Sequence, residues 1–214
     1  MLNHRRDWIR DARPAQLPPP GDWLVWFLVA GRGFGKTRTG AEWCGWDSWQ
    51  QPNTYAAVVA PTLDAAREVC FEGRSGLLKT VPPECVRYYN RTTVEMELTN
   101  GTKMLAYSAE KPDTMRGPEF HRAWCDELGS WKPGLMQYSM DMLDMALRAG
   151  KMPRKVITST PKPFPLLRQI IKDPNTFITR GSTYENRDNL APSFLHSVLK
   201  YEGTTMGRSE EHTS

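Results

Sequence analysis

Apolar residues along this chain come in short uninterrupted runs, separated by segments of mixed polarity. The runs Trp23–Ala30 and Tyr55–Pro61 contain almost no polar side chain, which is typical of strands buried on both faces of a sheet. The pattern predicts further strands over His121–Leu128, Arg154–Pro163 and Thr176–Ser182.

Helices are predicted between these strands. One follows the first strand, and small residues on it recur at helical spacing, which predicts close packing against the sheet: Thr37, Gly40, Ala41, Cys44, Gly45 and Ser48. The other predicted helices are Thr62–Gly73 with Thr62 as N-cap, Leu135–Gly150 closed by Gly150, Phe164–Lys172 and Pro192–Tyr201.

The middle of the chain has a different period. Val94, Met96 and Leu98 alternate with polar residues, and the dipeptide Asn100-Gly101 follows them. A period of two before an Asn-Gly turn predicts a β-hairpin.

Strands that alternate with helices indicate an α/β fold with a mainly parallel sheet and helices on both faces. Residues 1–22 are polar and basic and end in the stiff connector LPPPGD. We therefore expect an N-terminal arm over residues 1–22, followed by one domain over residues 23–207.

A glycine-rich loop follows the first strand. The segment Ala30–Thr37, AGRGFGKT, matches the phosphate-binding pattern G-x-x-x-x-G-K-[ST] except at the first position, where alanine stands. Gly31, Gly33 and Gly35 permit positive φ and close approach of the backbone to a phosphate. A glycine-rich turn with an incidental lysine is the simpler alternative, and the buried strand ahead of the loop disfavours it.

The side chains of this loop also have expected roles. Lys36 would reach the β- and γ-phosphates of a nucleotide, and the Thr37 hydroxyl would bind Mg²⁺. Arg32 and Phe34 lie between the glycines and belong to the same predicted nucleotide-binding segment. The loop alone does not distinguish a kinase, a GTPase, a helicase or a motor.

Two adjacent acids narrow the choice. Asp126 and Glu127 stand at the end of the strand predicted over His121–Leu128. An aspartate there can hold Mg²⁺, and the adjacent glutamate can activate an attacking water. The pair indicates hydrolysis of a nucleotide, whereas two surface acids at a strand end are the alternative.

Hydroxyl and guanidinium groups complete the candidate site. Thr158, Ser159 and Thr160 end a strand before a proline, which puts hydroxyls at the sheet edge where a γ-phosphate would lie. Arg116, ahead of the acids, is a candidate to contact the transferring phosphate in this subunit or in a neighbour's site, and Arg32 is its competitor.

Charge and cysteine content exclude few functions. The 214 residues carry 28 basic and 24 acidic side chains, a net charge of +4, which is too small to indicate a nucleic-acid binder. A basic run at Arg148, Lys151, Arg154 and Lys155 is a candidate DNA contact, although a solvated helix end is the favoured explanation.

The cysteines and the apolar runs bear on the compartment. Cys44, Cys70, Cys85 and Cys125 have no CxxC spacing, which argues against a metal or disulfide framework. No apolar run approaches the ~20 residues of a membrane span, and the N-terminus lacks a signal-peptide core. We expect a soluble intracellular protein.

Taken together, these residues resemble the ATPase domain of the large terminase subunit, the motor that packages DNA into tailed-phage and related viral capsids. The matching segments run in family order over nearly the whole chain: GDWLVWFLVAGRGFGKTRTGAEW, PDTMRGPEFHRAWCDEL, VITSTPKP and TYENRDNLAPSFL. The first is distinctive, and the others are individually weaker.

The resemblance implies a P-loop NTPase fold of the RecA/ASCE-like class and Mg²⁺-dependent ATP hydrolysis. By position it assigns nucleotide binding to residues 31–37, metal binding to Thr37 and Asp126, and the role of catalytic base to Glu127. It assigns the coupling of hydrolysis to movement to Thr158–Thr160. Arg116 matches a catalytic arginine ahead of the acids, and Gln16 matches a residue that recognises adenine.

The resemblance also implies partners: double-stranded DNA bound independently of sequence, a portal protein, a small terminase subunit, and a homo-oligomeric ring of the full-length protein. The setting would be the cytoplasm of an infected bacterial host. A helicase-type P-loop ATPase, or a nucleotide-binding module with little turnover, are the alternatives.

The chain departs from the family pattern at its end. Family members carry an RNase H-like nuclease domain after the ATPase domain, and no such domain follows here, so no nuclease activity is expected of this chain. The segment RSEEHTS, residues 208–214, resembles the translation of a sequencing-library adapter, which predicts a non-native tail.

Overall fold

The computed structural model describes residues 1–200, and for residues 197–200 only the backbone. Residues 201–214, which include the expected tail over 208–214, lie outside the described part. One sheet runs through the centre of the molecule in the strand order β3-β4-β5-β2-β6-β7-β1-β8. The strands are β1 Val25–Ala30, β2 Tyr55–Ala60, β3 Val86–Asn90, β4 Glu95–Leu98, β5 Lys103–Ser108, β6 Arg122–Cys125, β7 Arg154–Ser159 and β8 Thr176–Gly181.

Parallel pairing dominates this sheet. β1 pairs with β7 and β8, β2 pairs with β5 and β6, and β6 pairs with β7, all in parallel. Among the described strands only β4 runs in the opposite direction, so that it pairs antiparallel with β3 on one side and with β5 on the other. The hairpin predicted around the Asn100-Gly101 turn is therefore confirmed, and it extends a parallel sheet.

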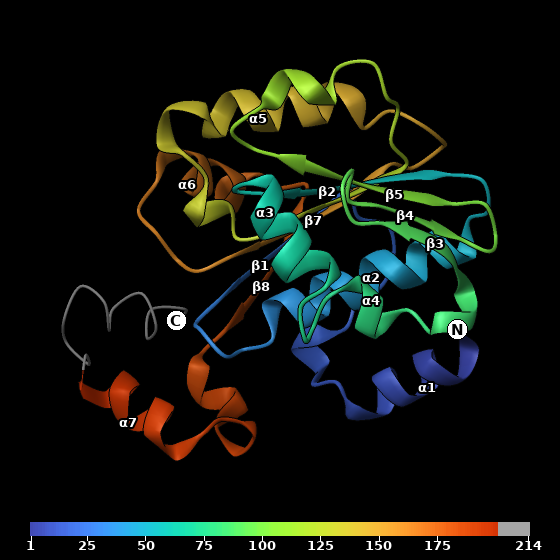
Figure 1. Cartoon of the computed structure of the whole chain (residues 1–214). Helices are drawn as coiled ribbons and strands as arrows, with labels where there is room; N and C mark the ends of the chain where they lie inside the picture. Colours follow the sequence, from blue (N-terminus) through green and yellow to red (C-terminus); the bar gives the residue numbers. More distant parts are fainter. Residues whose placement is uncertain (201–214) are drawn as a thin grey trace.

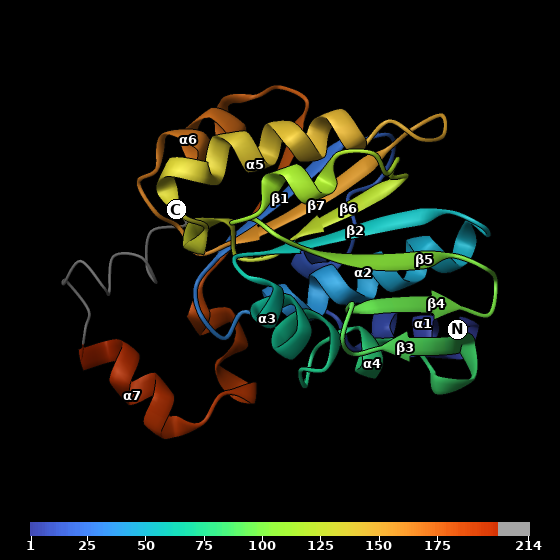
Figure 2. The ribbon, with the colours of Figure 1, turned by 45° about the horizontal axis from the view of Figure 1, so that its top comes forward.

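Helices cover both faces of the sheet (Figures 1 and 2). Seven α-helices fall within residues 1–200: α1 Leu2–Asp11, α2 Lys36–Gln50, α3 Leu63–Ala65, α4 Leu77–Thr80, α5 Pro133–Ala146, α6 Pro165–Lys172 and α7 Pro192–Lys200. In both views α5 and α6 lie on one side of the sheet, and α1, α2 and α4 lie on the other. The predicted α/β class, with a mainly parallel sheet and helices on both faces, is confirmed.

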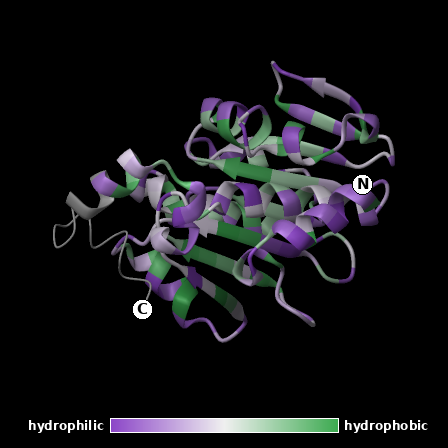
Figure 3. Ribbon diagram, turned by 90° about the horizontal axis from the view of Figure 1, so that it is seen from below, coloured by the Kyte–Doolittle hydropathy of each residue, from purple (hydrophilic) through white to green (hydrophobic). Residues whose placement is uncertain are grey.

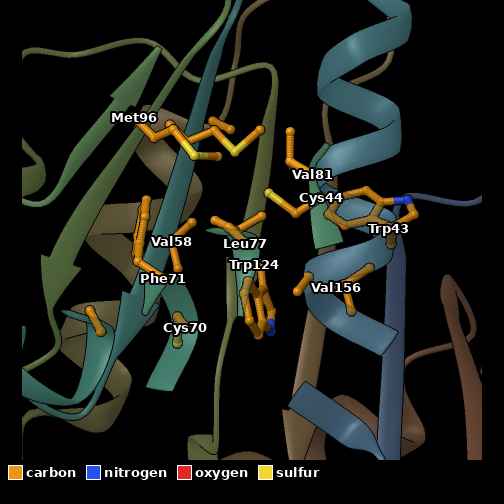
Figure 4. Packing of buried hydrophobic residues seen from close by; sticks show 14 of the residues in the cluster. Trp43, Cys44, Val58, Cys70, Phe71, Leu77, Val81, Met96, Trp124 and Val156 are labelled. Atoms are coloured by element: carbon orange, nitrogen blue, oxygen red, sulfur yellow. The ribbon is translucent and has the colours of Figure 1, made fainter. Parts of the chain in front are cut away.

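Strand residues alternate between two buried cores. Trp26, Val58 and Trp124 face the α2 side, where they pack with residues of α2 and α4 (Figure 4). Their chain neighbours Phe27 and Val59 face the opposite side and pack with α5 and α6. Because both faces are covered, the sequence of each central strand is a nearly continuous apolar run, and Figure 3 shows green, hydrophobic stretches along the central strands.

The small-residue face of α2 lies close to the sheet, as its spacing predicts. A Cβ on Gly40 would lie 2.2 Å from Nε1 of Trp124, and a Cβ on Gly45 would lie 2.9 Å from Cγ2 of Val81. A side chain at Gly40 would push α2 away from β6, the strand that carries the acids, and one at Gly45 would push α2 away from the end of α4.

Two helix predictions need correction. The segment after Thr62 starts as an α-helix, with the Thr62 hydroxyl accepting from the Ala65 amide, but continues as a π-helix over Ala66–Phe71. The helix predicted to close at Gly150 ends at Ala146. Gly150 has a φ of +80° and belongs to the connection that follows.

Residues 1–22, expected as an arm, contain α1 and a 3-10 turn over Pro14–Gln16. α1 packs on α2 through the buried carboxylate of Glu42, which accepts from His4 Nε2 at 2.9 Å and from Arg38 Nε at 2.8 Å. The other 3-10 turns are Pro83–Cys85, Pro112–Met115, Leu128–Ser130 and Thr183–Asn189. Within residues 1–200, no helix combines the length and the apolar character needed to cross a bilayer.

Candidate active site

Parallel strands bring their carboxyl ends to one edge of the sheet, and the candidate residues follow three adjacent strands there. The glycine-rich loop follows β1, the two acids follow β6, and the hydroxyl residues Thr158–Thr160 end β7. β7 lies between β1 and β6. The hydroxyl segment therefore stands between the loop and the acids, in the crevice where α/β sheets bind ligands.

The glycine loop makes a tight turn into the first turn of α2. Gly33 and Gly35 have φ values of +75° and +96°, and α2 begins at Lys36. Gly31 does not adopt positive φ, in contrast to the expectation. Its amide donates to the Gly181 carbonyl at 3.1 Å instead, which ties the start of the loop to the end of β8.

Lys36 is buried and points back across the loop. Its Nζ donates to the carbonyls of Ala30 at 2.9 Å and Gly31 at 3.1 Å, and lies 3.8 Å from Oε2 of Glu127. The ammonium therefore lies between the loop and the acids. Thr37, the residue expected to bind the metal, is half-buried in the first turn of α2, while Arg32 is exposed and Phe34 is buried.

Asp126 is a carboxylate withdrawn from water. Its side chain is almost fully buried, and burial raises its pKa from 3.8 to about 6, although a hydrogen bond from Thr158 and the charge of Lys36 oppose that rise. The Thr158 hydroxyl donates to Asp126 Oδ1 at 2.8 Å. A buried carboxylate with so little compensation suits a cation.

Glu127 has a left-handed backbone, with a φ of +48°, and its carboxylate has partners other than those of Asp126. Its Oε1 accepts from the Thr160 amide at 2.9 Å and from the Thr160 hydroxyl. Its Oε2 faces Lys36. A non-glycine residue in this conformation is strained, and the result here is two adjacent acids in two different environments.

The end of β7 holds the acid segment in place. The Thr158 hydroxyl accepts from the Glu127 amide at 3.2 Å, and the Ser159 hydroxyl accepts from the Gly129 amide at 2.9 Å. With the Thr160 contacts to Glu127, all three predicted coupling residues bond to the acid segment. Movement of β7 along its axis would move both acids.

Arg116 and Gln16, the other two candidate residues, have partners within the chain. Arg116 is exposed, pairs with Asp113 at 2.9 Å and donates to the Tyr138 hydroxyl at 2.7 Å. These contacts hold it against α5 and away from Lys36. Gln16 lies against the loop: its Oε1 accepts from Arg13, and its Nε2 lies 3.4 Å from Thr39 Oγ1.

The basic run is not a free cationic surface. Lys155 is buried in β7 and pairs with Asp144. Arg148 pairs with Glu119 at 3.0 Å, and the Arg154 guanidinium stacks over the Trp23 ring. Three of the four residues proposed as a DNA contact are therefore engaged within the domain.

Sequence reasoning missed one contact to the loop. The segment after β8 returns to the glycine loop, where Asn186 Nδ2 donates to the Gly33 carbonyl at 2.6 Å. Leu190 packs so closely that a Cβ on Gly33 would lie 2.8 Å from its Cδ2. The asparagine in TYENRDN was the available signal, but nothing local to it indicates which carbonyl it would reach.

These features define the class of protein: a P-loop nucleotide-binding domain of the ASCE type, with the loop, the acids and an intervening strand at one edge of a parallel sheet. The profile of the terminase large subunit, T4likevirus-type, N-terminal domain matches residues 27–212. The chain belongs to this family. No curated protein sequence matches it.

Solved structures share the fold. The large terminase ATPase domain of Thermus phage P74-26 is 14% identical with a TM-score of 0.69, over 94% of this chain and 92% of that one. The large terminase of a thermophilic bacteriophage in complex with ADP is 13% identical with a TM-score of 0.70, over 97% and 50%. The HK97 bacteriophage large terminase is 23% identical with a TM-score of 0.59, over 95% and 45%. The chain thus spans about half the length of the latter two proteins.

The buried Asp126 predicts an unusual dependence of stability on pH. Its folded pKa of about 6 lies above the unfolded value of 3.8, so the folded state holds the proton more tightly and this group lowers stability as pH rises through that window. Without metal or nucleotide, Asp126→Asn should gain stability over the parent chain between pH 4 and pH 8, by at most about 3 kcal/mol.

Urea unfolding of both chains at several pH values measures this difference. Asp141→Asn, at an exposed acid on α5, is the matched control and should show a difference that does not change over the same range. Parallel stability curves for Asp126→Asn and the parent chain would contradict the assignment.

Proposed function

We propose that this chain is the ATP-hydrolysing motor domain of a phage terminase large subunit, and that the whole protein drives double-stranded DNA into a procapsid. The observation that carries the proposal is the set of contacts at the strand edge. The Lys36 ammonium lies 3.8 Å from the Glu127 carboxylate. Thr158 bonds to the Asp126 carboxylate, and Thr160 bonds to the Glu127 carboxylate. Nucleotide, base and coupling strand would thus meet at one point.

Binding would begin with an exchange of partners at Lys36. Its ammonium now donates to two loop carbonyls, and phosphate oxygens are stronger acceptors because they are charged. Amides of the glycine loop and of the first turn of α2 would donate to the same phosphates. The related terminase structures that contain ADP and ATP-gamma-S support nucleotide binding by this fold.

The residues that would hold a magnesium ion are Thr37 and Asp126. A hydroxyl and a buried carboxylate are hard oxygen donors of the kind Mg²⁺ takes, and the raised pKa of Asp126 fits a group that a cation would keep ionised. When bound, the ion supplies charge neutralisation at the phosphates. Asp126 in turn is oriented by the Thr158 hydroxyl.

Glu127 would act as the general base. Thr160 holds Oε1, which leaves Oε2 directed toward Lys36 and the phosphate side of the site. The carboxylate would take a proton from the attacking water as the bond from that water to the γ-phosphorus forms and the bond from the γ-phosphorus to the β–γ bridging oxygen breaks, which releases ADP and phosphate. Loss of the γ-phosphate would then change the charge beside the two acids. The end of β7 would respond to this change because Thr158, Ser159 and Thr160 bond to the acid segment.

The partners of the whole protein are part of the same proposal: double-stranded DNA contacted mainly through phosphates, a portal protein, a small terminase subunit, and neighbouring copies in a ring. A helicase-type ATPase shares the loop and the acids and remains the enzymatic alternative. The setting would be the cytoplasm of an infected bacterium.

Replacing the proposed base separates binding from turnover. Glu127→Gln preserves the size of the side chain and the acceptor for Thr160, so ATP affinity should stay within about twofold while hydrolysis falls by ~10²-fold or more. Calorimetric titration and phosphate release measure the two quantities. Glu84→Gln, at an exposed acid far along the chain, is the control. Undiminished phosphate release from Glu127→Gln would remove Glu127 from the mechanism.

Arg116 is proposed to act in a neighbour's site, because in its own subunit it pairs with Asp113 and Tyr138. Arg116→Ala should then bind ATP but hydrolyse it ~10³-fold more slowly. Mixing it with Glu127→Gln should restore part of the activity, since some sites would combine an intact base with an intact neighbour. A mixture no more active than its components would favour a nucleotide-binding module or an arginine acting elsewhere.

A further inference from the structure

Phe34 anchors the glycine loop to the sheet. Its ring is fully buried and packs with Leu28, Ala30 and Ala15. A Cβ on Gly181, the last residue of β8, would lie only 2.0 Å from the ring, so the edge strand leaves this space to Phe34. The side chain is thus fixed, while the glycines on either side leave the backbone around it adjustable.

The peptide unit between Phe34 and Gly35 is the adjustable part. Gly35 has a φ of +96°, and glycine accepts either sign of φ at similar cost, so this unit can rotate unless its carbonyl is held. In a planar trans peptide the carbonyl and the following N–H point in opposite directions. The direction of the Phe34 carbonyl therefore sets the direction of the Gly35 amide, one of the loop donors available to a phosphate.

Arg13 holds that carbonyl. Its Nη2 donates to the Phe34 oxygen, and its guanidinium carbon lies 4.4 Å from the centre of the Phe34 ring. Its Nε donates to Gln16 Oε1 at 3.2 Å. Gln16 in turn lies against the loop, since a Cβ on Gly35 would fall 2.7 Å from Gln16 Nε2.

The arginine is not placed there for stability alone. Its Nη1 is buried without a hydrogen-bond acceptor among residues 1–200, and a buried unsatisfied donor costs free energy. An apolar side chain over the Phe34 ring would avoid that cost but would leave the carbonyl unheld.

We propose that Arg13 is a positioning residue of the phosphate site: it locks the Phe34–Gly35 peptide so that the Gly35 amide points into the loop. The inference rests on the proposed nucleotide site and adds to it a residue outside the glycine loop. It also gives Gln16 a structural task, because the amide oxygen of Gln16 is already committed to Arg13.

The test compares Arg13→Met, Arg13→Lys and the parent 214-residue chain. Methionine keeps an unbranched side chain over the ring without a donor, so affinity for Mg·ATP should fall about tenfold, the loss of one charge-assisted hydrogen bond. Lysine offers one donor group and cannot donate to both Phe34 and Gln16 in the arginine geometry. The Mg·ATP affinity of Arg13→Lys should therefore lie between those of Arg13→Met and the parent chain. Arg10→Met, on an exposed arginine of α1, is the control and should bind as the parent does.

A second measurement reads the peptide directly. In ¹H–¹⁵N spectra without nucleotide, the Gly35 amide should give one sharp resonance in the parent chain and a broadened or doubled one in Arg13→Met. Thermal melting checks that each variant folds, and Arg13→Lys serves if Arg13→Met does not.

The outcomes separate the two proposals. A parent chain that binds no ATP defeats the proposed function, while the Gly35 resonance still tests Arg13. Equal ATP affinity in Arg13→Met and the parent overturns the positioning role. So does weakened affinity with an unchanged Gly35 resonance, since Arg13 would then act by some route other than this peptide.

Discussion

Hydrogen bonds between the end of β7 and the segment after β6 hold the site together. Thr158 bonds to Asp126 and to the Glu127 amide, Ser159 to the Gly129 amide, and Thr160 to the Glu127 carboxylate. These bonds exist because β7 lies between the loop strand β1 and the acid strand β6. With another strand order the acids would lack these partners, and an event at the phosphates would have no direct connection to the sheet.

The same edge concentrates charge that the protein alone does not neutralise well. Asp126 is buried enough that its pKa rises to about 6, Lys36 donates to backbone carbonyls, and Glu127 occupies a left-handed conformation. The burial of the Asp126 carboxylate and the left-handed backbone of Glu127 each lower the stability of the isolated domain. Strain and desolvation gathered at one point are expected where a charged ligand and a cation complete the arrangement.

A feature of the fold or of the site could be predicted from the sequence when the residues that determine it lie close together along the chain. The P-loop, the acid pair and the hydroxyl strand end were readable because short motifs and buried runs specify them. The burial of Arg122 at the start of the acid strand was not readable, because it depends on a partner on another element, Asp47 on α2, at 2.6 Å. Likewise the position of α1 depends on the contact of His4 with Glu42, far along the chain, and the burial of Lys155 depends on its pairing with Asp144. Such pairings arise only once the sheet order is known.

A crystal structure of this chain with Mg²⁺ and a non-hydrolysable ATP analogue would show whether this edge of the sheet binds the nucleotide. We expect the β- and γ-phosphates on the amides of the glycine loop, Lys36 moved from the Ala30 and Gly31 carbonyls onto phosphate oxygens, and the metal between Thr37 and Asp126. A nucleotide bound elsewhere, with Lys36 still on those carbonyls, would contradict the proposed site.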